Sequence, residues 1–214
     1  MATRDEIIDV VLNRLGNRSA DTALRAFAEA ELLLVQERLE GEASPPWFLL
    51  TERASASTTA DEPRLPVPAN FLQEWEEGAL LVLDSTNSEE DEVIKDDYDA
   101  LKAKYKNTAA GIPVHYALRN DVFWLFPTPD IVYTIYMTYF KSQVALTTNI
   151  TTPWTTHASD VLIGELGIVL AGEYLHNDQL KARFEANTLR ARNRLSAKST
   201  AREEANRSRT MGDD

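Results

Sequence analysis

The sequence has no cysteine and only three histidines. Without cysteine, the chain cannot form disulfides, iron–sulfur clusters or cysteine-ligated zinc sites, and it cannot use a thiol as a nucleophile. The histidines His115, His157 and His176 fall in different expected elements, and no HxxxH or HxH spacing occurs. Metal-binding pairs normally show such spacing, so His115 and His157 are better interpreted as packing and capping residues. We expect no metal and no other cofactor.

The motifs of common enzymes are also missing. None of the patterns GxGxxG, GxxxxGK[ST] or GxSxG occurs, which removes the support for a phosphate-cradling loop or a nucleophile elbow. The sequence contains many Asp and Glu residues from which a carboxylate pair could be chosen. No pattern, however, indicates that two of them face each other across a cleft, as glycoside hydrolysis requires. The sequence therefore favours a protein that is not an enzyme.

Long hydrophobic runs are absent as well. The apolar runs stop well short of the roughly 20 residues that a membrane span needs, and the first residues, MATRD, lead into polar, acidic sequence and not into a signal-peptide core. We expect no secretion, no membrane partner and synthesis in the cytoplasm. With 214 residues and 43% hydrophobic content, the chain is long enough to bury a core in one domain or two small ones.

Basic residues are outnumbered by acidic ones but are unevenly placed. The formal charge of −12 argues against a general nucleic-acid binder, because such a protein neutralises phosphates with Lys and Arg. Residues 181–209, however, contain nine Lys or Arg against three Glu. This basic segment is either a solvated helix face or a surface with its own partner, which could be DNA or an acidic protein surface.

Helical patterns occupy both ends of the chain. Thr3 and Glu6 form a capping-box pattern that begins a helix ending at Gly16, and a second helix is expected from residue 19 or 21 to residue 39. Near the other end, a helix over residues 157–175 contains three glycines, which are costly in a helix interior. Close approach of another helix or backbone is the expected compensation.

A final helix is expected from Gln179 towards Ser199 or beyond. Its apolar content thins along its length, and residues 201–214 are nearly all polar. Such a segment cannot bury enough surface to order itself, so it is either frayed or ordered by a partner.

Strand patterns fill the middle of the chain. Residues 114–118, 122–126 and 131–140 are rich in β-branched and aromatic residues and are separated by turn signals, which predicts a β-meander. The third run is apolar on both faces, so a second layer or a neighbouring subunit should cover it. Further strands are expected at 47–57 and 79–83, with an edge segment at 64–68.

Two clusters in this region have alternative interpretations. The acidic cluster over residues 84–99 lacks the spacing of an EF-hand loop, so a solvated loop is expected in place of a calcium site. The aromatic residues of the strands are interpreted as core or subunit interface, with a sugar or base platform as the alternative. The expected inter-subunit residues are Tyr133, Tyr136, Met137 and Tyr139.

These patterns predict an α+β fold in which N- and C-terminal helices form an α-helical bundle around a central antiparallel β-rich domain. We expect a helical hairpin over residues 1–44 and a β-rich domain over 45–152, with a short helix near 96–105. Helices over 153–200 then complete the bundle, and 201–214 form a polar tail or arm.

The order of several short motifs resembles a known family. PWFL at 46–49 follows the two helices and is followed by LPVPANFL at 65–72, YDALK at 98–102, IPVHYAL at 112–118 and VFWLFPTP at 122–129. This order resembles tailed-phage head-to-tail adaptors, also called connector or head-completion proteins, over most of residues 1–175. Asn70 is a departure, because the family often has an acid before the Phe.

The resemblance implies a non-enzymatic virion protein at the head–tail junction. Such a protein forms a ring of twelve copies beneath the portal, carries the tail nozzle or tail tube, and lets DNA pass through its lumen without sequence-specific binding. The net negative charge suits such a lumen. From composition, we expect portal contacts in the C-terminal segment, at Arg190, Arg192, Arg194, Arg202 and Arg207. The alternative is a carbohydrate-binding or glycan-cleaving module that uses the aromatic strands.

Overall fold

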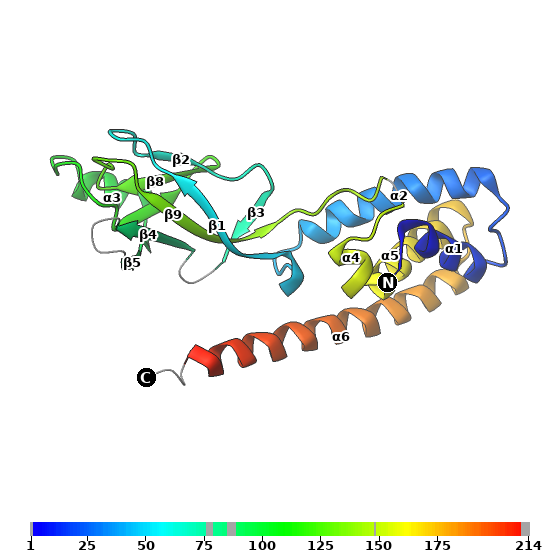
Figure 1. Ribbon diagram of the computed structural model, residues 1–214. Helices are drawn as coiled ribbons and strands as arrows, with labels where there is room; N and C mark the ends of the chain where they lie inside the picture. Colours follow the sequence, from blue (N-terminus) through cyan, green and yellow to red (C-terminus); the bar gives the residue numbers. More distant parts are fainter. Residues whose placement is uncertain (1, 76–78, 85–88, 148, 211–214) are drawn as a thin grey trace. The chain divides into compact units, whose positions relative to one another are not determined.

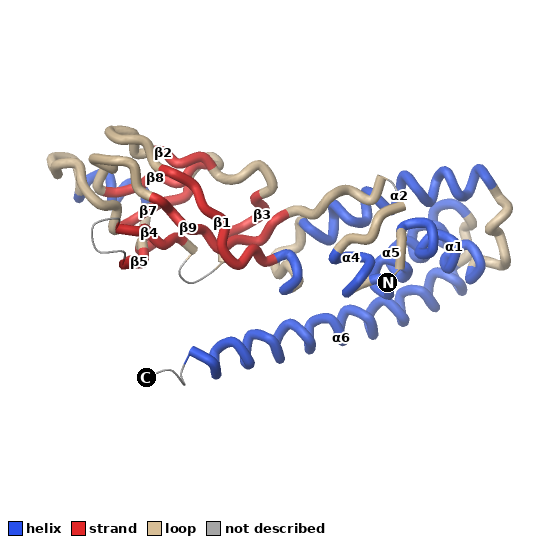
Figure 2. The backbone as a smooth tube through the Cα atoms, in the orientation of Figure 1, coloured by secondary structure: helices blue, strands red, loops and turns tan. Residues whose placement is uncertain are grey.

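The computed structural model describes residues 2–75, 79–84, 89–147 and 149–210 (Figure 1). The chain divides into two compact units. A helical unit comprises Met1–Leu49 with Gln143–Asp214, and a β unit comprises Leu50–Ser142. Figure 2 shows the strands gathered in the β unit, which also contains the short helix α3 (Tyr98–Lys104). Within the described residues, no helix is long and apolar enough to cross a membrane.

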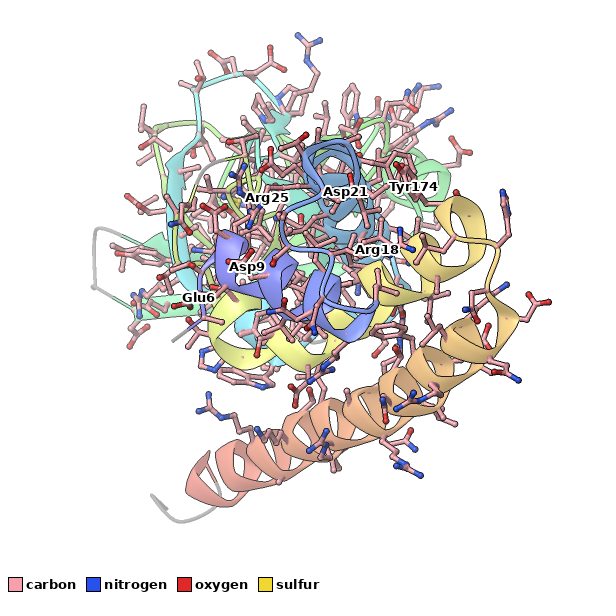
Figure 3. The ribbon with its side chains drawn as sticks, turned by 90° about the vertical axis from the view of Figure 1, so that its right-hand side faces the viewer. Glu6, Asp9, Arg18, Asp21, Arg25 and Tyr174 are labelled. Atoms are coloured by element: carbon pink, nitrogen blue, oxygen red, sulfur yellow. The ribbon has the colours of Figure 1, made fainter. Side chains whose placement is uncertain are left out.

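Two helices begin the helical unit. α1 (Arg4–Arg14) has the predicted capping box, in which the Glu6 amide donates to Thr3 Oγ1 and the Thr3 amide donates to Glu6 Oε2. α2 (Thr22–Glu40) begins at Asp21, whose side chain accepts from the Leu24 amide at 3.0 Å. An ion pair joins Arg25 of α2 to Asp9 of α1, and both residues are labelled in Figure 3. The buried faces of the two helices supply much of the apolar core of this unit.

The C-terminal part of the helical unit is more segmented than predicted. In place of one helix over 157–175, the chain forms α4 (Pro153–His157), α5 (Ser159–Val169) and a π-helical turn, η2 (Leu170–Tyr174). Thr152 caps α4, which starts earlier than predicted, and the break falls at Ala158, whose φ of −135° is not helical. The last helix, α6, runs from Asp178 to Thr210.

The buried carboxylate of Glu40 anchors the end of α2. It accepts hydrogen bonds from the Trp154 indole at 2.8 Å, the Gln36 side chain at 2.9 Å and the Gln143 amide at 3.3 Å. These bonds connect α2 to α4 and to the segment that re-enters the unit. A buried carboxyl group is tolerated when hydrogen-bond donors satisfy its oxygens in this way.

The β unit contains two sheets. The first has the order β1-β9-β4-β5, and β3 also pairs with β9. All its pairings are antiparallel. Its strands are β1 (Leu50–Ser57), β3 (Phe71–Glu74), β4 (Leu80–Asp84), β5 (Glu89–Glu92) and β9 (Thr134–Lys141).

The second sheet has the order β2-β8-β7-β6. Its β2–β8 and β7–β8 pairings are antiparallel, and the short β6 runs parallel to β7. As predicted, the proline-containing β2 lies at a sheet edge. The strands of this sheet are β2 (Arg64–Pro66), β6 (Ile94–Lys95), β7 (His115–Leu118) and β8 (Val122–Phe126).

The two sheets share one apolar core. Leu125 and Phe123 of the second sheet belong to the same buried cluster as Val82 and Ile135 of the first. The predicted α+β fold, with terminal helices that pack together and central antiparallel sheets, is therefore confirmed.

Three local predictions for this region are wrong. The β-meander ends after β8, because β9 belongs to the other sheet. The connecting segment is held at the end of β1, where the Tyr133 amide donates to Thr58 Oγ1 at 2.8 Å. Residues Trp47–Leu49 form a 3-10 turn, η1, so the strand begins only at Leu50. Residues 89–92 pair with β4 and are not a loop, while residues 85–88 lie outside the described part.

Candidate partner-binding surface

The first half of α6 is held against α5 by two glycines. A Cβ built on Gly164 would overlap the Thr188 hydroxyl and lie 3.0 Å from Thr188 Cβ, and one built on Gly167 would lie 2.6 Å from Phe184 Cγ. Phe184 and Thr188 are both 4% exposed. The predicted compensation for these glycines, close approach of another helix, is therefore confirmed.

An ion-pair network extends this attachment. Glu165 of α5 is 8% exposed and accepts from Arg38 at 2.7 Å and from Arg192 at 2.6 and 2.8 Å. Arg192 also makes two parallel hydrogen bonds to Glu42, at 2.8 and 2.9 Å. These hydrogen bonds, chiefly that to Glu42, raise the pKa of Arg192. Arg192 is thus paired with carboxylates of its own chain. It connects α6 to Glu165 of α5 and to Glu42, which follows α2.

A groove of about 880 Å³ opens beside this attachment. Its walls come from the end of α1, the start of α5 and the first half of α6. Asp160 partly offsets the basic lining, since it lies 3.4 Å from Arg194. Among the described residues, the other three lining arginines have no ion-pair partner. The lining residues are Arg14, Asp160, Leu180, Arg183, Phe184, Asn187, Arg190, Asn193 and Arg194.

The second half of α6 meets an aromatic cluster. The Arg202 guanidinium carbon lies 3.5 Å from the centre of the Trp47 ring, a cation–π contact. The His157 ring lies 4.8 Å from Trp47 and 5.5 Å from Phe48. Desolvation of His157, followed by the positive charges of Arg202 and Lys198, lowers the pKa of His157. Protonation of His157 would therefore oppose the contact between α6 and Trp47.

The structure separates the five arginines expected at the portal. Arg190 and Arg194 line the groove, Arg192 belongs to the internal network, and Arg202 lies on Trp47. Arg207 falls within α6, but its side chain lies outside the described part.

Arg14 and Arg183 belong to this surface although neither was among the five expected portal contacts. Arg183 lies in the basic segment 181–209 for which a partner was considered, whereas Arg14 lies outside it. Arg183, Arg190 and Arg194 follow each other at intervals of seven and four, which places them on one helical face. That signal was available in the sequence. The approach of Arg14, which belongs to α1, could be known only from the fold.

The four residues expected between subunits are mostly internal. Tyr133, Met137 and Tyr139 are 4%, 3% and 5% exposed and belong to the core of the β unit. Tyr136 is half-buried on the other face of β9, where the Arg53 guanidinium carbon lies 3.9 Å from its ring centre. Of the four, only Tyr136 presents surface to a neighbour, and its interface role stays a prediction. With two of these rings and Phe123 in the core, the aromatic strands do not support the alternative of a glycan platform.

The titratable residues that the structure describes do not gather into a metal site. Within the described part of the chain, no three His, Asp or Glu side chains are placed to hold an ion. His115 contacts Tyr105, with Nδ1 2.9 Å from the phenol oxygen, and desolvation together with the charge of Lys104 lowers the pKa of His115. The acidic strand β5 is exposed at all four positions.

Comparison with models of known protein families matches residues 2–212 to the SU10 adaptor protein family. The match spans both units and every helix and strand of the fold. No curated protein matches the sequence.

Proposed function

Because the chain belongs to the SU10 adaptor protein family, it is a phage head-to-tail adaptor, and we propose that it forms a ring joining the portal to the tail nozzle or tail tube. In this proposal twelve copies surround a channel that continues the path of the DNA. The protein works by binding and has no turnover. Its net charge of −12 supports a channel along which DNA moves without adhering.

The observation that carries the proposal is the change in packing along α6. Among its described side chains, the buried ones are Phe184, Thr188 and Ala191. The described side chains beyond Ala191 are exposed or half-buried, although the backbone stays helical to Thr210. Helices in water gain most of their stability from packing an apolar face, and this half has little of one. A polar, basic helix without cover supports the role of an arm that binds a partner.

We assign the portal contact to this second half of α6, with Arg202 and Arg207 as contributors. Arg202 reaches the portal by leaving Trp47, and the cation–π contact it gives up is of modest strength, about 0.5–2 kcal/mol. Arg192 takes no part, because its hydrogen bonds to Glu42 and Glu165 hold α6 in place.

The test is a chain that stops after Ser196, which keeps the glycine contacts and the Arg192 network. We expect its helical content per residue and its unfolding midpoint to stay close to those of the full chain, while its affinity for the portal protein of the same phage falls at least about tenfold. The full chain with R18E and K106E, two exposed basic residues elsewhere, is the control and should bind normally. Equal portal affinity of the truncated and full chains would refute the assignment.

A further inference from the structure

We propose that the basic groove of one copy holds the acidic edge strand β5 of a neighbouring copy. This inference rests on the proposed ring, because it names the two surfaces through which adjacent subunits meet. The groove is the one between α1, α5 and the first half of α6, and the strand is Glu89–Glu92.

The groove has the chemistry of a carboxylate-binding surface. Arg14, Arg183 and Arg190 have no ion-pair partner among the described residues, and arginine binds carboxylates through two parallel hydrogen bonds. Asn187 and Asn193 add neutral donors between them. Phe184, which is 4% exposed, forms part of the lining, so it lowers the hydration around the arginines. Several guanidinium groups on one concave surface fit a ligand with several negative charges.

Strand β5 supplies those charges. All four of its residues are acidic and exposed, and the strand lies at the end of its sheet. Glu90 is paired with Arg53, whereas Asp91 and Glu92 have no ion-pair partner within the described part of the chain. Charged edge strands disfavour edge-to-edge pairing of sheets. The contact is therefore made by side chains and not by addition of a strand.

The spacing of the charges matches. Arg190 and Arg194 are four residues apart on a helix, about 6 Å along its axis. Alternate residues of a strand, such as Glu90 and Glu92, are about 6.6 Å apart and lie on one face. Arg183 lies about 10 Å further along α6, which is close to the length of a four-residue strand. A strand laid along this helix therefore meets Arg183 at one end and Arg190 at the other, and Arg194 lies about 6 Å beyond.

Each copy has one groove and one acidic strand, and the two surfaces belong to different units of the chain. Such a contact is not self-complementary. Each copy donates its strand to one neighbour and receives a strand from the other. Such a head-to-tail contact generates a ring when the rotation between neighbours closes, as the proposed function requires. The negative β unit and the basic groove thereby become parts of one assembly contact.

Charge exchange tests the inference in complexes with the portal protein of the same phage. The groove variant is R183E/R190E and the strand variant is E90K/E92K, which reverses the two charges on one face of β5. We expect each alone to give at least about tenfold less complete ring on the portal than the native chain. A mixture of the two variants should recover the ring, because every reversed groove then faces a reversed strand. The R18E/K106E chain changes the net charge by the same amount as the groove variant and should assemble normally.

A cysteine pair gives an independent readout, because the chain has no cysteine of its own. The double variant N187C/E92C should form a ladder of disulfide-linked oligomers when assembled and oxidised, and neither single variant should form it.

The outcomes separate this inference from the proposed function. If the native chain forms no ring on the portal, the proposed function and the inference both fail. If it forms one but the charge variants also assemble normally, or the mixture does not recover, the inference alone is overturned. If the groove variant instead loses portal binding in a way that the strand variant does not rescue, that result would assign the groove to the portal and overturn the inference. A disulfide within one chain would place the contact inside the subunit and would also overturn it.

Discussion

Gly164 and Gly167 allow α5 and α6 to lie closer together than any larger residue would permit. At both positions an added Cβ would meet a buried side chain of α6, so the neighbouring helix would have to move. The Glu165 network lies on the same helix and depends on the same spacing, since Arg192 of α6 reaches Glu165 at 2.6 Å. Small changes at the glycines should therefore affect how the whole arm is attached.

We predict that Gly167→Ala lowers the free energy of unfolding by about 1–3 kcal/mol, the usual cost of overfilling a packed core. Gly41→Ala is the matched control. There the nearest contact of the added Cβ is 3.5 Å from the Glu37 carbonyl oxygen, so it should be close to neutral. Chemical denaturation of both variants measures the difference. Equal stability of the two variants would show that α6 is not held at Gly167.

At the scale of elements, α6 combines two different halves. The first half is fixed by packing and ion pairs, and the second is attached at its described side chains mainly by Arg202 on Trp47. His157 lies beside that contact with a lowered pKa. Well above pH 6.5 the imidazole is neutral in both folded and unfolded chains. As the pH falls through that value, the unfolded chain takes up a proton that the folded chain resists, so stability decreases.

We therefore predict that lowering the pH from 7.5 to 5.5 reduces the unfolding midpoint of the native chain more than that of His157→Gln. The other titrating groups are common to both proteins, so the difference between them isolates His157. A series of thermal melts provides the comparison. Identical losses in the two proteins would mean that the charge of His157 has no influence on the arm.

Local signals predicted those parts of the fold that depend on neighbouring residues. The Thr3–Glu6 capping box, the glycine-rich helix and the β7–β8 hairpin could all be recognised from spacing alone. The sheet to which β9 belongs could not, because its pairing with β1 and β4 joins residues far apart in the sequence. Strand β5 was missed for a related reason: four acids have low strand propensity, and only pairing with β4 makes them a strand.

The candidate site was likewise predictable only in part from the sequence. A basic C-terminal helix could be predicted from composition, and Arg190 and Arg194 do line the groove. The internal role of Arg192 depends on Glu42 and Glu165, which come from distant parts of the chain. Burial of Tyr133, Met137 and Tyr139 likewise follows from the second sheet, whose position over β9 the sequence did not specify.

At the scale of the whole molecule, charge is divided between the basic α6 segment and the acidic remainder. In the proposed function, the protein binds its own copies and two different partners while DNA passes through. We assign these tasks to separate surfaces: the second half of α6 to the portal, the basic groove and β5 to adjacent copies, and the excess negative charge to the channel. Many modest contacts repeated around a ring are sufficient to hold such an assembly.

Cryo-electron microscopy of the purified protein mixed with the portal protein of its phage tests the adaptor ring most directly. We predict a ring of the protein on the tail side of the portal, with the C-terminal half of α6 lying against portal subunits. A complex without a ring, or a ring in which α6 makes no contact with the portal, would contradict this assignment.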